Sequence, residues 1–596
     1  MTDAEIARLQ AAAAAAAAKA ARLEAEAAAA ALAAATAAAE SPNLHKPAAS
    51  TPLSGYPAEV QASYRHIADT NPSITIGAMI DEDGSALAQV PISVPLATLN
   101  RHGLISGATG TGKTRTLQLL AEQLARAGVP SLVTDVKGDL TGIAEAGTPT
   151  EKLLARTSEL GQHWQPQAFN IEYFTVNNQP AATALRTTVT AFGPLLLARV
   201  LGLNDTQESA LTLIFHWADK EHLELIDLTD LREVIDYLLS DEGKPILKTL
   251  GGISSATAGV ILREIATLQA QGGDDFFGVP DFATRDLLRT SNNGQGIISL
   301  LSLPQLATNP RLATTLIMWL IADLFSGLDE VGDTDKPRLT IFFDEAHLLF
   351  ADASKAFIDQ VIHTVRLIRS KGVGIIFITQ HPTDLPEAVL GQLGAKIQHA
   401  LRAFTPKEQK QLRATVDSLP VSPLDLSKRI TELGTGEALI SVLDGRGIPT
   451  PVAPTKLYAP QSVMGPANQA TLQQLHESSR LAIKYGAPMN PYSAFEKLAA
   501  RKAEHLQQQQ AAAAAEAQAK AEAERRKQLE KEQLAQARRL EQEAKALRRQ
   551  EQERQREQER AARQRNKLID SVVRSVGGQL GREITRSIFG TSRRRK

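Results

Sequence analysis

The sequence predicts an α/β fold with a mainly parallel sheet, a helical insertion, and long helical N- and C-terminal extensions. Short strand-like runs alternate with amphipathic helical runs on both sides of a central stretch, residues 150–290. That stretch is mostly helical and lacks regular strands apart from Ile171–Val176. Alanine dominates residues 1–40, while Gln, Ala, Glu, Arg and Lys dominate 499–565. Alternation of this kind is typical of parallel sheets covered by helices on both faces.

The first ordered elements are expected near residues 72–100. Ile74–Ile76 and Pro91–Val94 flank the turn-like run Asp81–Gly84, as in a pair of short strands. Residues before them are rich in Pro and Ser, so 41–70 is assigned as a linker. The alanine-rich segment 1–40 is expected to be a low-complexity helical extension, because alanine favours helix but buries little surface.

The alternating part begins after these strands. Its strand-like runs are short and apolar, and they are expected at Leu104–Ile105, Ser131–Thr134, Gly296–Leu300, Leu339–Phe343, Gly374–Thr379, Lys396–Leu401 and Gly436–Ser441. Its helical runs carry apolar residues on one face, and they are expected at Thr114–Ala127, Leu312–Phe325 and Lys355–Ser370. We therefore predict one domain over 71–460, interrupted by the mostly helical insertion 150–295 and followed by a connecting segment, 461–498.

Composition excludes several classes of protein. Lys and Arg number 65 against 66 Asp and Glu, a net charge of −1, so the basic excess of proteins that coat duplex DNA is absent. There is no cysteine, which excludes disulfides and cysteine-based zinc sites. The start of the chain has no signal-peptide pattern, and the longest apolar run, Thr314–Phe325, is too short to span a bilayer. A cytoplasmic protein is expected.

A glycine-rich run carries the strongest chemical signal in the chain. It matches the pattern G-x-x-x-x-G-K-[ST] over Gly107, Ala108, Thr109, Gly110, Thr111, Gly112, Lys113 and Thr114. Glycines let the backbone curl so that several N–H groups point at phosphate oxygens, and the following helix adds its positive N-terminal end. Lys113 would reach the β and γ phosphates, and the Thr114 hydroxyl would ligate Mg²⁺. The run predicts an ATP site that uses Mg²⁺.

A P-loop also requires an acidic element on another strand. The apolar run Leu339–Phe343 is followed directly by Asp344 and Glu345. Asp344 would hold Mg²⁺ through its water shell, and Glu345 would polarise the attacking water. The next predicted strand ends at Gln380, which would lie beside the P-loop and contact the γ-phosphate or the attacking water.

Six motifs follow one another along the chain over about 70–460: GATGTGKT, Asp135–Asp139, Gly272–Phe277, FFDEAHLLF, GVGIIFITQHP and Gly436–Ser441. In this order, they resemble the HerA/FtsK superfamily of ring-forming P-loop ATPases, and more narrowly the HerA-like bacterial proteins of the YjgR type. The resemblance implies a RecA-like core, ATP hydrolysis, and homo-oligomers, in the form of hexameric rings, that act on DNA.

Ring ATPases of this class use an arginine from the neighbouring subunit to stabilise charge on the transferred phosphoryl group. We rank Arg402 first for this role, because it follows a predicted strand whose tip faces the nucleotide edge of the sheet. Arg366 and Arg369, on the helix after Asp344, are the other candidates.

The C-terminal segments leave the choice of substrate open. Leucines in 499–565 are spaced irregularly, which predicts a charged single helix or a loose coiled coil. Residues 566–596 are expected to form an amphipathic helix with a basic end, and its apolar face consists of Ile569, Val572, Val573, Val576, Leu580, Ile584 and Ile588. Docking onto a protein is favoured over a membrane surface or DNA, because Gly577 and Gly581 would allow another helix to approach closely.

Three functions follow from these observations. The first is an oligomeric ATPase that translocates or remodels DNA. The second is an ATPase that remodels or scaffolds a protein partner held by its terminal helices, without activity on DNA. The third is a nucleotide-binding scaffold with little turnover, against which the intact Lys113, Asp344 and Glu345 argue.

Overall fold

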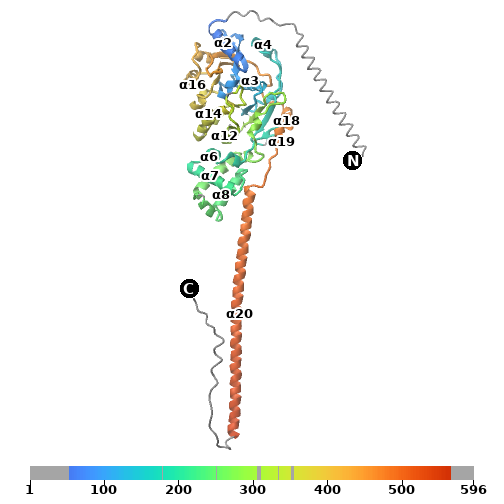
Figure 1. Ribbon diagram of the computed structural model, residues 1–596, viewed down its shortest axis with the longest axis vertical. Helices are drawn as coiled ribbons and strands as arrows, with labels where there is room; N and C mark the ends of the chain where they lie inside the picture. Colours follow the sequence, from blue (N-terminus) through green and yellow to red (C-terminus); the bar gives the residue numbers. More distant parts are fainter. Residues whose placement is uncertain are drawn as a thin grey trace, which may run out of the picture. The chain divides into compact units, whose positions relative to one another are not determined.

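A computed structural model describes residues 53–565, except 178, 250, 305–309, 333 and 351–354. The chain divides into two units, Met1–Leu498 and Ala499–Lys596. The helices expected at 1–40 and 566–596 lie outside the described residues. Figure 1 shows the first unit, coloured from blue to orange along the sequence.

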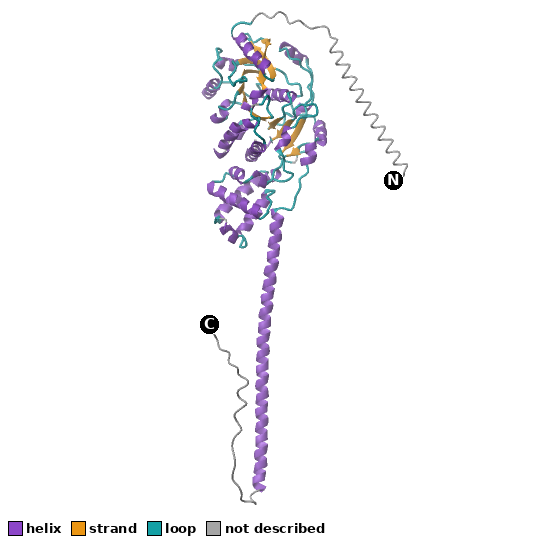
Figure 2. Ribbon diagram, in the orientation of Figure 1, coloured by secondary structure: helices purple, strands orange, loops and turns teal. Residues whose placement is uncertain are grey.

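A twelve-stranded sheet forms the centre of the first unit (Figure 2, orange). Its strand order is β2-β1-β12-β11-β10-β3-β9-β8-β4-β7-β5-β6. The strands from β10 to β6 run parallel, and β11, β12, β1 and β2 continue the sheet as an antiparallel wing. The predicted α/β fold with a mainly parallel sheet is therefore confirmed.

The strands have the following bounds: β1 Ser73–Ile80, β2 Ala86–Pro95, β3 Gly103–Ser106, β4 Ser131–Asp135, β5 Ile171–Thr175, β6 Thr183–Ala184, β7 Ile298–Ser302, β8 Leu339–Phe343, β9 Val373–Thr379, β10 Ala395–His399, β11 Glu437–Ser441 and β12 Ala453–Leu457. The helices have the following bounds: α2 Tyr56–Thr70, α3 Lys113–Arg126, α4 Glu151–Glu159, α5 Val189–Phe192, α6 Pro194–Val200, α7 Asp205–Lys220, α8 Leu228–Leu239, α9 Lys244–Thr249, α10 Ser255–Ala270, α11 Gly273–Phe276, α12 Pro310–Gly327, α13 His347–Phe350, α14 Lys355–Ile368, α15 Glu387–Leu390, α16 Pro406–Asp417, α17 Leu426–Glu432, α18 Gln469–Ser478, α19 Arg480–Tyr485 and α20 Ala494–Arg565.

The central strands are apolar throughout because both faces of the sheet are covered. In β8, Ile341 and Phe343 belong to one buried cluster, while Phe342 between them belongs to the other. In β9, Phe377 and Ile378 divide in the same way. Since successive side chains of a strand point to opposite faces, a strand between two helical layers needs an unbroken apolar run.

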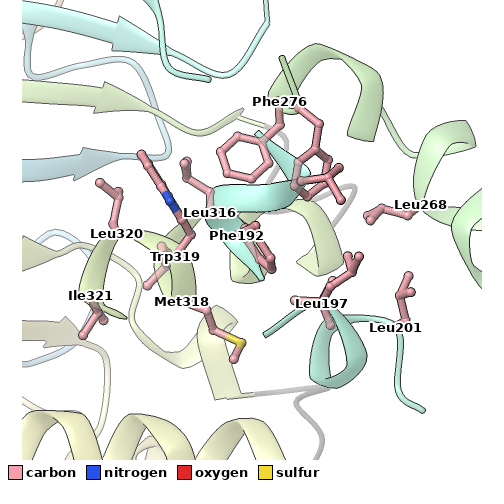
Figure 3. Packing of buried hydrophobic residues seen from close by; sticks show 14 of the residues in the cluster. Phe192, Leu197, Leu201, Leu268, Phe276, Leu316, Met318, Trp319, Leu320 and Ile321 are labelled. Atoms are coloured by element: carbon pink, nitrogen blue, oxygen red, sulfur yellow. The ribbon is translucent and has the colours of Figure 1, made fainter. Parts of the chain in front are cut away.

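Helices α5 to α11 form the predicted insertion between β6 and β7, and Figure 1 shows α6, α7 and α8 grouped at one end of the first unit. Phe276 packs this insertion against α12: its ring centroid lies 6.2 Å from that of Phe192 and 5.7 Å from that of Trp319. Figure 3 shows these side chains in one apolar cluster. The insertion stretch also contributes β5 and the short β6 to the sheet, and β6 is absent from the sequence prediction.

Residues Tyr56–Thr70, which fall within the expected linker 41–70, form helix α2 instead. Val60, Tyr64 and Ile67 are buried, and their spacing of three and four residues places them on one helical face. The Tyr64 hydroxyl donates a hydrogen bond to the Ile440 carbonyl oxygen at 3.1 Å. The linker prediction is wrong over α2, because this apolar face packs on the antiparallel wing.

The helix predicted for 499–565 lies within α20, which is 72 residues long. At 1.5 Å per residue, it extends about 110 Å. Ion pairs one turn apart support it, with the Nζ of Lys520 and of Lys545 each 2.8 Å from a glutamate oxygen, Glu516 and Glu541 respectively. Among the described helices, none combines the length and the apolar character needed to cross a bilayer.

Candidate nucleotide site

The glycine-rich loop leaves β3 and enters α3 at Lys113, as predicted. It is anchored to three neighbouring strand ends. The Gly107 N–H donates to the Gln380 carbonyl after β9 at 3.1 Å, and the Ala108 N–H donates to the Ala400 carbonyl after β10 at 2.8 Å. On the other side, the Gly436 N–H before β11 donates to the Thr111 carbonyl at 2.9 Å. These bonds fix the loop at the carboxyl edge of the parallel strands.

Two of its glycines are required by close contacts. A Cβ atom at Gly107 would lie 2.5 Å from the Cβ of His399, and Gly107 has a φ of 152°. A Cβ atom at Gly112 would lie 3.2 Å from the backbone nitrogen of Gly436, at a φ of 113°. Side chains rarely tolerate such backbone angles, so glycine satisfies both the conformation and the space.

Seven of the predicted residues line one cavity of about 270 Å³: Thr109, Gly110, Gly112, Lys113, Thr114, Asp344 and Glu345. Lys113 and Thr114 come from the start of α3, and Asp344 and Glu345 come from the turn after β8. The strand order β3-β9-β8 explains this convergence, because it separates the loop from the carboxylates by a single strand. The Lys113 Nζ donates to the Gly107 carbonyl at 2.6 Å and therefore lies over its own loop.

Asp344 has the properties of a metal ligand. Its side chain is 4% exposed, Oδ1 accepts a hydrogen bond from the Glu345 N–H at 3.0 Å, and Oδ2 is buried with no hydrogen-bond partner. Burial, aided by the nearby Glu345 charge, raises the pKa of Asp344 to about 6. An unpaired, buried carboxylate oxygen in a cavity that Thr114 also lines suits a hard divalent cation such as Mg²⁺, which prefers oxygen ligands. The residues therefore fit the predicted metal.

Glu345 sits in strained backbone. Its φ is +48°, a left-handed value that non-glycine residues seldom adopt, and such strain tends to gather at functional sites. Its Oε1 accepts a hydrogen bond from the Nζ of Lys137 at 2.6 Å, and the Nδ1 of His347 lies 3.4 Å from Oε2. Lys137 lines the same cavity as the seven predicted residues. The sequence prediction did not include Lys137 in the site, although the Asp135–Asp139 run follows a strand that neighbours β8.

The remaining predicted residues lie at different edges of the sheet. Gln380 follows β9, between the P-loop strand and the Asp344 strand, as expected. Arg402 is exposed, two residues beyond the Ala400 carbonyl that accepts the Ala108 N–H. Arg366 and Arg369 precede β9 and so belong to the opposite, amino-terminal edge of the parallel strands. Of the three candidate arginines, Arg402 alone follows a strand at the P-loop edge.

A larger cavity of about 620 Å³ adjoins the first and shares Gly112, Arg115, Thr435 and Met464 with it. Arg156 of α4 lines this cavity and donates hydrogen bonds to the carbonyl oxygens of Gly436 and Leu457, each at 3.2 Å. Trp164 donates its indole N–H to the Pro460 carbonyl at 2.7 Å. Aromatic and aliphatic walls with a few polar groups suit a flat heterocyclic base and a ribose. The sequence prediction missed this cavity, because its walls come from segments about 300 residues apart.

A family model described as "Helicase HerA-like C-terminal" matches residues 82–596. The chain belongs to this family.

Two relatives of this HerA-like protein are archaeal DNA double-strand break repair helicases named HerA. The one from Sulfolobus acidocaldarius is 24% identical over 356 residues, which are 59% of this chain and 64% of the relative. The one from Sulfurisphaera tokodaii is 24% identical over 373 residues, which are 62% of this chain and 66% of the relative. The chain thus aligns with slightly less than two thirds of each relative.

Solved structures similar to the HerA-like protein include the plasmid coupling protein TrwB in complex with ADP and Mg²⁺. That structure shares 15% identity, covers 66% of this chain and 97% of its own, and has a TM-score of 0.44.

Proposed function

We propose that this HerA-like protein binds ATP together with Mg²⁺ and hydrolyses it to ADP and phosphate. The observation that carries the proposal is the convergence of Lys113, Thr114, Asp344 and Glu345 on one cavity at the carboxyl edge of the sheet. The proposed ATPase domain spans 71–460. The adjoining cavity beside Arg156 is the proposed site for the base and the ribose.

Each residue then has a distinct role. Backbone N–H groups of Gly107–Thr114 bind the phosphates, and Lys113 places its charge against the β and γ phosphates. Thr114 and Asp344 hold Mg²⁺, which when bound offsets phosphate charge. Gln380 orients the γ-phosphate or the attacking water, from its position on the strand between P-loop and carboxylates.

Glu345 is the proposed general base. It accepts a proton from water as the water oxygen forms a bond to the γ-phosphorus. The bond between that phosphorus and the bridging oxygen breaks, and ADP leaves with the electron pair. Arg402 of a neighbouring subunit would stabilise the charge on the transferred group.

We further propose that the chain assembles into a homo-oligomer, a hexameric ring, that moves along or remodels DNA. Membership of the HerA-like family and the names of its archaeal relatives support this proposal. The test is the rate of ATP hydrolysis with and without duplex DNA, together with the mass of the protein in solution with ATP. Several-fold stimulation of an oligomer supports a DNA motor, whereas an ATP-bound monomer contradicts it.

The second candidate is an ATPase that remodels or scaffolds a protein partner. The feature that favours it is α20, whose side chains are exposed from Leu506 to Glu559 and thus present a long surface. An ATPase rate that is indifferent to DNA, but falls when the chain is cut after residue 498, would favour this candidate over the DNA motor.

A further inference from the structure

Lys137 and Glu345 form a close ion pair inside the proposed nucleotide site. The Lys137 Nζ lies 2.6 Å from Oε1 of Glu345, whose side chain is only 13% exposed. The ammonium group occupies the space beside Oε1 that an attacking water would need for a hydrogen bond to this oxygen. The pair therefore opposes the role proposed for Glu345 as long as it persists.

Hydrogen bonds fix the backbone turn that carries Lys137, whereas the lysine stem is intrinsically flexible. The buried carboxylate of Asp135 accepts hydrogen bonds from the Gly138 N–H at 2.7 Å and from the Leu140 N–H at 3.1 Å. These bonds fix the turn after β4. The Lys137 side chain itself is 50% exposed, and a lysine stem has four rotatable carbons. The ammonium group can therefore reach a second partner in the cavity without a change in the turn.

The cavity contains two lysines with different surroundings. Lys113 donates to the Gly107 and Ala108 carbonyls of the loop, at 2.6 and 3.2 Å. Lys137 contacts Glu345 across the cavity, on the side of the acidic turn. Burial lowers the pKa of Lys137, but the hydrogen bond and charge of Glu345 outweigh it and raise the pKa overall, so the group is a cation.

A triphosphate in this cavity would give Lys137 a second anionic partner. Phosphate oxygens are strong acceptors for an ammonium group, and a lysine binds them as a point charge. The attacking water would lie between the Glu345 carboxylate and the γ-phosphorus, so an ammonium group drawn into close contact with the phosphate oxygens moves away from Glu345. The two anions therefore compete for Lys137.

We propose that Lys137 exchanges partners during the ATP cycle. It pairs with Glu345 until a nucleoside triphosphate binds, and then moves to the γ-phosphate and releases Glu345 to accept the proton of the attacking water. This positioning role rests on the proposed ATP hydrolysis. A diphosphate offers no γ-phosphate, so the exchange makes the general base competent only when the substrate is complete.

The experiment measures the affinities for ATPγS and ADP in the wild-type protein, Lys137→Met, Glu345→Gln and the double variant. Lys137→Met should weaken ATPγS binding about two- to fivefold, the range expected for a half-exposed ion pair, and leave ADP binding unchanged. Glu345→Gln should tighten ATPγS binding by a similar factor, because Lys137 no longer has a competing partner. That gain should be absent when Lys137 is methionine.

The double variant separates the two explanations of such a gain. If Glu345→Gln tightens ATPγS binding equally with and without Lys137, the carboxylate simply repels the phosphate, and the exchange is overturned. If Lys137→Met weakens ADP as much as ATPγS, Lys137 binds the inner phosphates, and the exchange is again overturned. If the wild-type protein binds neither nucleotide, the proposed function itself fails.

Two further variants control for charge and folding. Lys137→Arg keeps the charge and should preserve the preference for ATPγS over ADP. Lys244 and Asp241 form an exposed ion pair with the same Nζ–Oδ1 distance of 2.6 Å. Lys244→Gln breaks that pair and should change neither affinity. Equal melting temperatures of Lys137→Met and the wild-type protein would show that the side chain, and not the fold, causes the change.

Discussion

The Nε2 atom of His399 lies 2.9 Å from the Thr116 hydroxyl, which joins the end of β10 to the first turns of α3 beneath the P-loop. His399 is completely buried, and its Cβ lies against Gly107. The contact links a strand to the phosphate-binding loop through a titratable side chain, and two predictions follow from its geometry.

The stability of the protein should fall at acidic pH because of His399. Burial, reinforced by the Lys113 charge, lowers its pKa from 6.5 to about 4. Between these values the unfolded chain binds a proton that the folded chain excludes, so stability present above pH 6.5 is lost as the pH falls toward 4. The test is urea unfolding of the wild-type protein and of His399→Gln at a series of pH values between 6.5 and 4. Over this interval, the free energy of unfolding of the wild-type protein should fall by at most about 3 kcal/mol more than that of His399→Gln. Parallel pH curves for the two proteins would contradict this account.

The control for this experiment is His66→Gln, at an exposed position of α2. It also removes a histidine but should leave the pH dependence of stability as it is in the wild-type protein.

Alanine at Gly107 should damage the site far more than alanine at Gly110. Both glycines have positive φ, but the added Cβ would lie 2.5 Å from His399 at Gly107, whereas nothing lies within 4 Å at Gly110. Gly107→Ala must therefore displace the loop or β10, and ATP affinity should fall at least tenfold. Gly110→Ala carries only the backbone strain of about 1–2 kcal/mol. Equilibrium binding of ATPγS measures both effects.

Gly84→Ala is the matched control for backbone strain. Gly84 has a φ of 85°, close to the 81° of Gly110, and also has open space around it, but it lies in the turn between β1 and β2. It should reduce stability about as much as Gly110→Ala and leave ATP affinity unchanged. Equal affinities for Gly107→Ala and Gly110→Ala would contradict the role given to the His399 contact.

Lys113→Ala and Glu345→Gln should separate binding from chemistry. Lys113→Ala removes the charge proposed for the β and γ phosphates, so it should abolish hydrolysis and weaken ATP binding. Glu345→Gln should keep ATP bound but lower kcat by about 10²–10⁴-fold, because the shape of the site survives while the base is lost. Lys220→Ala, an exposed position of α7, should change neither value. Wild-type turnover in Glu345→Gln would exclude this carboxylate as the base.

Much of the site could be predicted because its parts are local in sequence. The loop Gly107–Thr114 and the pair Asp344–Glu345 each directly follow an apolar strand, and parallel strands bring their carboxyl ends to one edge. Lys137 also follows an apolar strand, β4, but nothing in the sequence showed that its partner would be Glu345, and His399 lies within β10 without a motif around it. Lys137 meets Glu345 across 208 positions, and His399 meets Thr116 across 283, so both contacts depend on which strands are neighbours in the sheet.

The errors in the fold prediction have similar causes. Helix α2 has a regular apolar face, but that face is recognisable only once the antiparallel wing it covers is known. Strand β12 includes Pro454, and proline within a short run is evidence against a strand. Strand β6, which pairs with β5, has only two residues, and two residues are too few to show a periodic pattern.

The last prediction concerns the proposed role of Arg402 in a neighbouring subunit. Arg402 is exposed after β10 at the edge that holds the P-loop, which is the location that the proposed role across a ring interface requires. Arg402→Ala should lower kcat, by up to about 10³–10⁵-fold in the best cases, while ATP affinity changes little. Arg446→Ala is the control and should leave kcat unchanged, because Arg446 is an exposed arginine of the antiparallel wing that pairs with Asp444.

Mixing inactive subunits tests whether Arg402 acts across the interface. Arg402→Ala subunits keep an intact P-loop, and Lys113→Ala subunits keep an intact Arg402. In randomly mixed rings, about a quarter of the interfaces would join the intact P-loop of one variant to the intact arginine of the other. ATP hydrolysis should therefore recover in part when the two variants co-assemble. An arginine that acts within its own subunit could give no recovery, because neither variant contains both groups, so mixed rings without activity would exclude the role across the interface.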